Sequence, residues 1–297
     1  MSAPDLASAV SRWAHRTPTV KAAILVGSRA HPPGDSLVAA ATDSDWDIQL
    51  VVGSPAAFHQ PEWAEGLGVG RPRAYVVRKA LWSGGLKINL ALAEADLDVM
   101  VLPARPLRRL HWLSVLGCHR HEGRTRNSLQ LLAYAIRPHW QFLKGETWLG
   151  PLYARAATLP DPALSDRAIR QLVAGFWYDH RWVLRKIARG ELVAAQRALH
   201  LELAEVNFRL RHTLRLRRGQ PSFEGARRLE QLAGPAERAA MTLDARCAPE
   251  ALAAAAERAA LTCRQLADEL LSPASAPTRL DSPFHAIPAR EQKQETA

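Results

Sequence analysis

Cysteine is scarce in this chain of 297 residues, which contains only Cys118, Cys247 and Cys263. Their number is odd, and no two of them form a Cys-x-x-Cys pair. This excludes the disulfide framework that holds many small secreted domains together. We therefore expect three reduced thiols and a cytoplasmic protein.

Long apolar runs are absent as well. No stretch of eighteen consecutive apolar residues occurs, and the amino-terminal segment 1–16 carries Asp5 and has no extended apolar region. We therefore expect neither a membrane span nor a signal peptide. The hydrophobic content of 47% predicts a packed soluble protein, and the length allows one large domain or two ordinary ones.

Negative charge is in the minority. The chain has 39 basic and 29 acidic residues, a net charge of +10 and a pI of about 10.1, and only six of the basic residues are lysines. A basic surface favours anionic partners such as nucleotides, nucleic acid or acidic membranes, and the charge alone does not choose among them.

The first third of the chain has the pattern of a mixed α/β domain. A helix is expected at 7–15, and short apolar or alternating runs predict five strands, at 20–26, 46–52, 74–78, 86–92 and 97–102. After Leu107 the apolar residues recur at spacings of three and four, which predicts helices at 128–142, 149–157, 165–189, 191–217, 222–232 and 249–271.

These patterns predict an α/β domain with a mixed sheet at 1–110, followed by an all-α helical bundle at 111–272. The segment 273–297 is rich in proline, serine and charge, and we expect it to be disordered.

The most informative motif pairs an apolar run ending in Gly27-Ser28 with Asp45-x-Asp47 at the head of a second run. Side chains alternate along a strand, so both carboxylates lie on one face, where they repel each other unless a cation lies between them. Mg²⁺ is the usual partner of such carboxylates and of phosphates. Gly27 allows the backbone to approach a phosphate, and Ser28 adds a donor.

A third carboxylate is expected on a later strand. Asp98 lies within an apolar run, where burial of a carboxylate without a partner is costly. Asp96 points the same way but lies nearer the turn, so it is the alternative. Three carboxylates on neighbouring strands suit metal-assisted nucleotidyl transfer, with Asp45 and Asp47 holding Mg²⁺ and Asp98 holding a second ion or accepting a proton.

Gly27-Ser28-Arg29, then Asp45-x-Asp47, then Asp98 resemble the motifs of the nucleotidyltransferase superfamily of DNA polymerase β type, and within it the bacterial aminoglycoside (streptomycin) 6-adenylyltransferases. The motif match covers about residues 22 to 102. The resemblance implies an amino-terminal nucleotidyltransferase domain that uses Mg²⁺ and ATP and transfers AMP to a hydroxyl of a small molecule, such as an aminoglycoside-like antibiotic. Arg29 either neutralises a phosphate or is a surface residue.

Two other functions remain open on the sequence. A protein or a tRNA is an alternative acceptor, and a non-catalytic nucleotide- or nucleic-acid-binding module is the alternative to an enzyme. Lys87 and Asn89 alternate on one strand face and either line the cleft or face solvent, and Asp179 is a candidate base from the helical half. An arginine cluster is either a nucleic-acid patch or, in the preferred interpretation, a solvated helix face: Arg209, Arg211, Arg215, Arg217 and Arg218.

Overall fold

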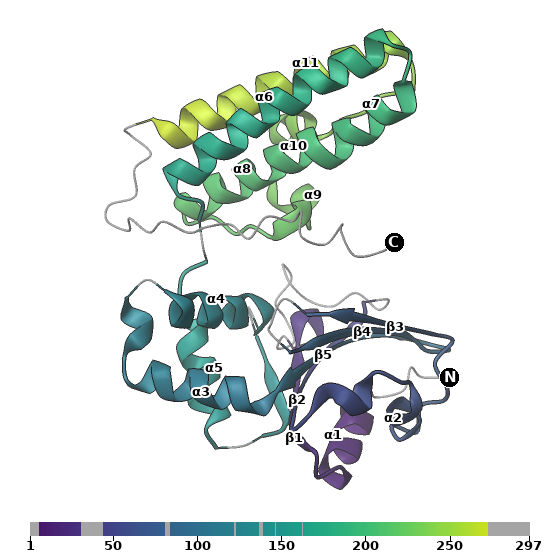
Figure 1. Ribbon diagram of the computed structural model, residues 1–297, viewed down its shortest axis with the longest axis vertical. Coiled ribbons are helices and arrows are strands. Elements are labelled where there is room, and N and C mark those ends of the chain that lie inside the picture. Colours follow the sequence, from purple (N-terminus) through teal and green to yellow (C-terminus); the bar gives the residue numbers. More distant parts are fainter. Residues whose placement is uncertain are drawn as a thin grey trace. The chain divides into compact units, whose positions relative to one another are not determined.

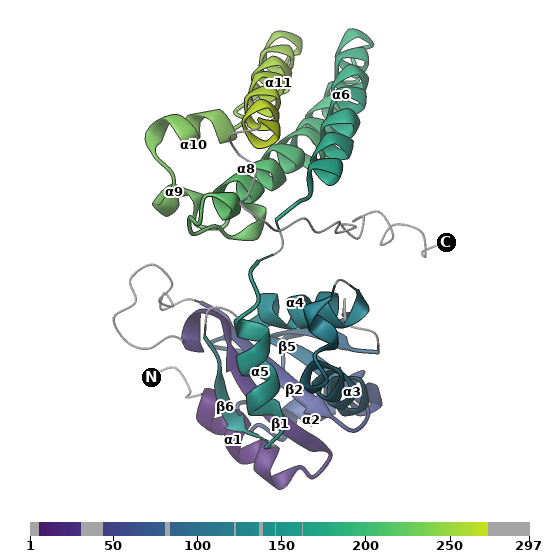
Figure 2. The same cartoon turned by 90° about the vertical axis from the view of Figure 1, so that its left-hand side faces the viewer.

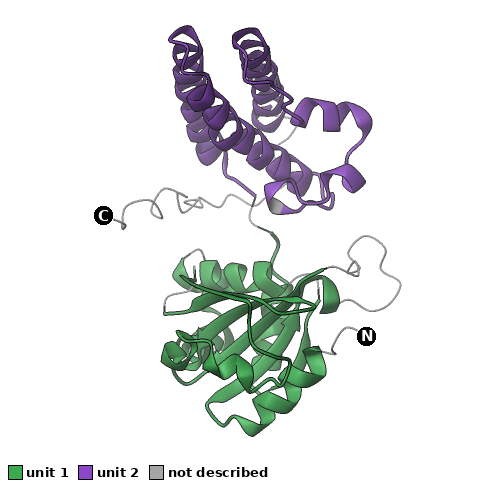
Figure 3. Cartoon of the chain, turned by 90° about the vertical axis from the view of Figure 1, so that its right-hand side faces the viewer, with its two compact units in different colours: residues 1–161 green, residues 162–297 purple. Residues whose placement is uncertain are grey.

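The computed structural model describes residues 6–30, 44–80, 84–121, 123–136, 139–145, 147–161 and 163–272 (Figure 1). The chain divides into two compact units, residues 1–161 and 162–297, which are coloured separately in Figure 3. The first unit contains a mixed sheet flanked by helices and the second is helical, so the expected fold class is confirmed.

Six strands form the sheet of the first unit, in the order β3-β4-β5-β2-β1-β6. β2 and β5 are parallel, and the other neighbouring strands are antiparallel. The strands span β1 Val20–Val26, β2 Trp46–Val52, β3 Ala74–Lys79, β4 Leu86–Ala91, β5 Asp96–Pro103 and β6 Gln141–Lys144. Five of them match the expected strands, since apolar runs bounded by turn residues are typical of buried strands.

β6 is the strand that the sequence interpretation missed, because residues 141 and 142 were assigned to a helix. That helix, α4, ends at Ile136. Pro138 in the sequence is the signal for this end, because proline lacks the N–H that a helix interior requires. Gln141–Lys144 pairs with the edge of β1, and the ammonium of Lys144 donates to the carbonyl oxygens of Ala14 (2.8 Å) and Val20 (2.6 Å).

Two apolar clusters lie on opposite faces of the sheet. One joins α1 (Leu6–Arg16), the 3-10 turn Pro55–Phe58 and α2 (Glu62–Glu65) to residues such as Ile48 and Leu50. The other packs α3 (Ala104–Val115), α4 (Arg124–Ile136) and α5 (Leu149–Ala157) on β1, β2, β5 and β6. Figure 2 shows these three helices together beside the sheet. Successive side chains of each strand therefore enter different cores.

The first unit extends to Asp161, beyond the boundary expected at residue 110. Helical periodicity begins near Leu107, but the helices that follow pack on the sheet and are interrupted by β6, so the change of pattern does not mark a change of unit. The expected tail, 273–297, lies outside the described residues.

The second unit consists of helices around one apolar cluster that includes Phe176, Leu203 and Leu252. A π-helical segment, Leu199–Ala204, joins α7 and α8, so the single helix expected at 191–217 is one run with an irregular middle. The α-helices are α6 Asp166–Ala188, α7 Leu192–Ala198, α8 Glu205–Arg217, α9 Leu229–Leu232, α10 Pro235–Met241 and α11 Pro249–Leu271. None of the helices among the described residues has the length and apolar character needed to cross a bilayer.

Candidate functional site

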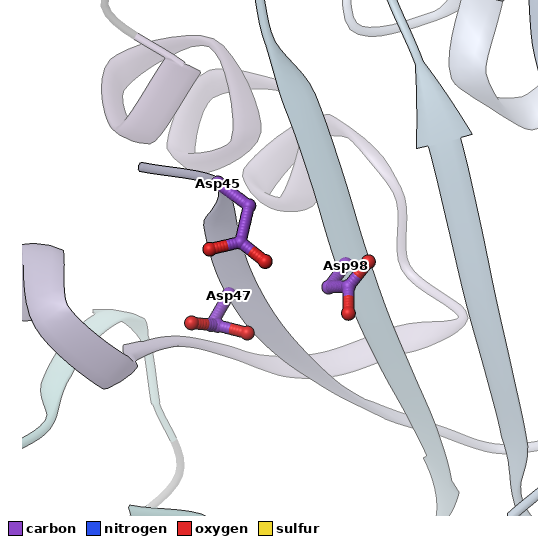
Figure 4. A group of neighbouring side chains, drawn as sticks. All are labelled: Asp45, Asp47 and Asp98. Atoms are coloured by element: carbon purple, nitrogen blue, oxygen red, sulfur yellow. The ribbon is translucent and has the colours of Figure 1, made fainter. Parts of the chain in front are cut away.

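Strand register brings three carboxylates together. β2 and β5 run parallel with Asp47 directly opposite Asp98, and Asp45 lies two positions before Asp47. Because side chains alternate, all three point to the same face of the sheet. One carboxylate oxygen from each residue lies within 4.8 Å of the other two, and Figure 4 shows the side chains converging from two strands.

Asp96, the alternative third carboxylate, is not a member of this group. It is exposed at the first position of β5, opposite Ala91 on β4. Asp98, in contrast, is half-buried and lies in the same row of the sheet as Asp47. The geometry therefore favours Asp98, two residues further along the same strand.

Gly27 lies against the carboxylate of Asp47. Its φ is +73°, a left-handed conformation that favours glycine. A Cβ atom at this position would be 2.2 Å from Asp47 Oδ2, which is far inside a normal contact. The 3-10 turn Gly27–Ala30 follows directly, so Ser28 starts from the edge of the carboxylate group. The close approach expected of this glycine is thus to a carboxylate of the chain itself.

Arg29 holds the backbone that leads into β2. Its Nε donates to the carbonyl oxygens of Ser44 (3.0 Å) and Asp45 (3.2 Å). The guanidinium carbon lies 4.5 Å from the ring centroid of Trp46, a cation–π contact. Arg29 therefore helps to position Asp45, which is a role that the sequence interpretation did not consider.

Two side chains of β4 contact Asp98, and both were expected either to line the cleft or to face solvent. Asn89 is directly opposite Asp98, and its amide donates to Asp98 Oδ1. The ammonium of Lys87 lies 3.2 Å from Asp98 Oδ2. Both oxygens of Asp98 thus have a partner on β4, which fixes the orientation of this carboxylate. Asn89 Oδ1 is buried and has no hydrogen-bond partner in the described part of the chain.

A buried pair behind the carboxylates was not foreseen. Gln49 follows Asp47 on the same face of β2, and its Oε1 accepts a hydrogen bond of 2.8 Å from the hydroxyl of Tyr153 on α5. Both side chains are buried, and burial raises the pKa of the Tyr153 phenol. The signal in the sequence was Gln49 itself, the one polar residue in the apolar run 48–52.

The candidates in the helical half belong to the second unit. Asp179 lies on α6, and its role as a base stays a prediction. Four of the clustered arginines form ion pairs within this unit: Arg211 and Arg215 with Glu237, Arg217 with Asp166, and Arg218 with Glu269. The side chains of Arg215 and Arg217 are only 9% and 8% exposed. The interpretation of the cluster as a solvated helix face was therefore wrong, because these arginines are tied to other segments of the unit.

The donor set of the carboxylate group suits a hard divalent cation. All three ligands are carboxylate oxygens, and Mg²⁺ and Mn²⁺ prefer oxygen ligands. Two unit charges at 4.8 Å repel by about 3 kcal/mol at an effective dielectric constant near 20. Lys87 compensates part of this repulsion at Asp98, and a cation among the three carboxylates would compensate the rest. The residues present therefore fit Mg²⁺.

No protein-family model and no curated protein matches the chain. Two solved structures are similar to it. An aminoglycoside 6-adenyltransferase from Bacillus subtilis is 11% identical, with 89% of this chain and 87% of that chain covered and a TM-score of 0.34. A nucleotidyltransferase-like protein from Exiguobacterium sibiricum is 12% identical, with 88% and 72% covered and a TM-score of 0.36.

Both proteins are described as a nucleotidyltransferase or as a protein like one, in agreement with the family that the motifs of this chain resemble. Identities and TM-scores of this size carry no conclusion about substrate, metal or acceptor. The functional conclusion therefore depends on the chain's own residues.

Proposed function

We propose that this protein is a Mg²⁺-dependent nucleotidyltransferase that transfers a nucleoside monophosphate, AMP from ATP, to a hydroxyl group of a small molecule. The observation that carries the proposal is the convergence of Asp45, Asp47 and Asp98 beside Gly27. Three carboxylates on two paired strands, next to a glycine turn, suit a metal-bound triphosphate and an acceptor hydroxyl.

Each residue has a separate task in this proposal. Asp45 and Asp47 would hold Mg²⁺, which supplies charge neutralisation at the attacking and leaving oxygens when it is bound. Ser28 and the backbone N–H groups of the turn at Gly27 donate hydrogen bonds to the β- and γ-phosphates. Arg29 keeps Asp45 in place.

Asp98 faces the acceptor. It either accepts the proton of the acceptor hydroxyl or contributes to a second metal site. A bond forms between the acceptor oxygen and the α-phosphorus, and the bond from the α-phosphorus to the oxygen of the leaving pyrophosphate breaks. Asn89 and Lys87 hold the carboxylate of Asp98 in one orientation, so its oxygens are aligned before the substrates bind.

The test measures Mg²⁺-dependent release of pyrophosphate and transfer of label from [α-³²P]ATP with a panel of hydroxyl-bearing acceptors, including aminoglycosides. Asp45→Asn and Asp47→Asn should remove turnover and weaken Mn²⁺ binding, which electron paramagnetic resonance measures without any substrate. Asp96→Asn is the matched control, because Asp96 is exposed, lies on β5 and is outside the carboxylate group.

An unchanged rate in Asp47→Asn would refute the proposed site. The absence of pyrophosphate release with every acceptor would refute the enzyme proposal and leave a non-catalytic nucleotide-binding module. Label on a protein or an RNA in a cell lysate, and on no small molecule, would replace the small-molecule acceptor by a macromolecular one.

A further inference from the structure

The face of β3 and β4 next to the carboxylate group carries a distinctive set of side chains. Register pairs Arg78 with Lys87 and Val76 with Asn89, and Asn89 pairs with Asp98. Directly opposite residues of an antiparallel pair point to the same face. Arg78, Lys87 and Val76 therefore share the face of Asp98.

Helices do not cover this part of the face within the described residues. The apolar cluster beneath α3, α4 and α5 takes its strand residues from β1, β2, β5 and β6 and none from β3 or β4. Val76 is 42% exposed, and the side chain of Lys87 is 43% exposed. An open surface with an apolar centre thus adjoins the carboxylate that faces the acceptor.

This surface is positively charged. Arg78 and Lys87 are directly opposite each other, and such like-charged pairs are unfavourable without a compensating anion. Lys87 is compensated by Asp98, whereas no carboxylate of the described residues forms an ion pair with Arg78. Arg78 presents a planar guanidinium that suits bidentate binding of a carboxylate or a phosphate.

We infer that the acceptor binds on this face of β3 and β4 and that it carries a carboxylate or phosphate group in addition to the hydroxyl that receives the nucleotide. Arg78 binds the acidic group, Val76 contacts the carbon skeleton, and the hydroxyl lies against Asp98. A polycationic aminoglycoside would place ammonium groups beside Arg78 and Lys87, where charge repulsion opposes binding. This inference rests on the proposed function and specifies its acceptor.

The test compares four acceptors at saturating ATP: a sugar phosphate, a hydroxycarboxylic acid, a neutral polyol of similar size and streptomycin. Each is assayed with the full-length protein and with Arg78→Met and Lys79→Met. Lys79 is the matched control, because it is exposed on the same strand and points to the opposite face. Only the acidic acceptors should be used efficiently by the unmodified protein.

In Arg78→Met the KM for the acidic acceptor should rise at least about tenfold, while kcat and the KM for ATP stay within about twofold of the unmodified protein, because Arg78 binds the acceptor and not the nucleotide. Lys79→Met should change none of these values. Efficient use of streptomycin or of the neutral polyol, or an unchanged KM in Arg78→Met, would overturn the acidic acceptor and leave the transferase intact. No pyrophosphate release with any acceptor would overturn the proposed function and, with it, this inference.

Discussion

Replacement of Gly27 by alanine is the sharpest perturbation that the site offers. The added Cβ would lie 2.2 Å from Asp47 Oδ2 and 2.9 Å from Asp47 Cγ, whereas real Cβ atoms essentially never approach another heavy atom within 3.0 Å. The carboxylate must therefore move by roughly 1 Å, which is a displacement that reduces rates by about 100-fold when it affects a reacting group.

A second cost of this substitution is independent of Asp47. Alanine at a φ of +73° is destabilised by about 1–2 kcal/mol relative to the right-handed conformation. Gly68→Ala separates the two effects, because Gly68 lies in the same unit with a φ of +71°, and a Cβ added there would have no neighbouring atom within 4 Å. Both variants should lose similar stability in urea unfolding.

The assay is the turnover number for pyrophosphate release, together with Mn²⁺ affinity measured without substrate. Gly27→Ala should lose about 100-fold in turnover and bind Mn²⁺ more weakly, while Gly68→Ala should keep both values within about twofold. If Gly27→Ala retained the activity of Gly68→Ala at equal stability, the position of Asp47 would not limit the reaction and the reasoning would be refuted.

Single contacts give three further predictions. Asn89→Ala removes a donor to Asp98 and should lower kcat by about 10–100-fold with little change in the KM for ATP, and steady-state kinetics would contradict it with an unchanged kcat. Tyr153→Phe leaves the buried Gln49 Oε1 without its donor and should cost about 1–3 kcal/mol in urea unfolding; no loss would show that the hydrogen bond adds nothing. Burial raises the pKa of the Cys263 thiol to about 12, so at pH 8 it stays protonated, and a thiol reagent should modify only the other two cysteines until the protein is unfolded.

Local patterns were sufficient for the strands that build the site. Apolar runs with turn residues at their ends located β1, β2 and β5, and alternation placed Asp45 and Asp47 on one face. The carboxylate at position 98 was assigned from the cost of burying it within an apolar strand, and the register of β2 against β5 puts it opposite Asp47.

Patterns failed where a long-range partner decides the structure. Residues 141–144 are a strand because the edge of β1 is available to pair with them, and a four-residue segment carries too little periodicity to indicate this. The arginines at the end of α8 lie on acidic partners distant in sequence, such as Glu237 for Arg215. Spacing along one helix cannot reveal such partners.

The sequence by itself determined which residues have the chemistry of a nucleotidyltransferase site: Gly27 with Ser28, and the three aspartates at 45, 47 and 98. Tertiary structure alone decided how they are used, because strand register joins positions about fifty residues apart. It set Gly27 against Asp47, gave Asp98 two partners on β4, and placed Arg78 beside them. Alternation along a strand can be read from one segment, whereas the neighbour across the sheet depends on which strand pairs with it.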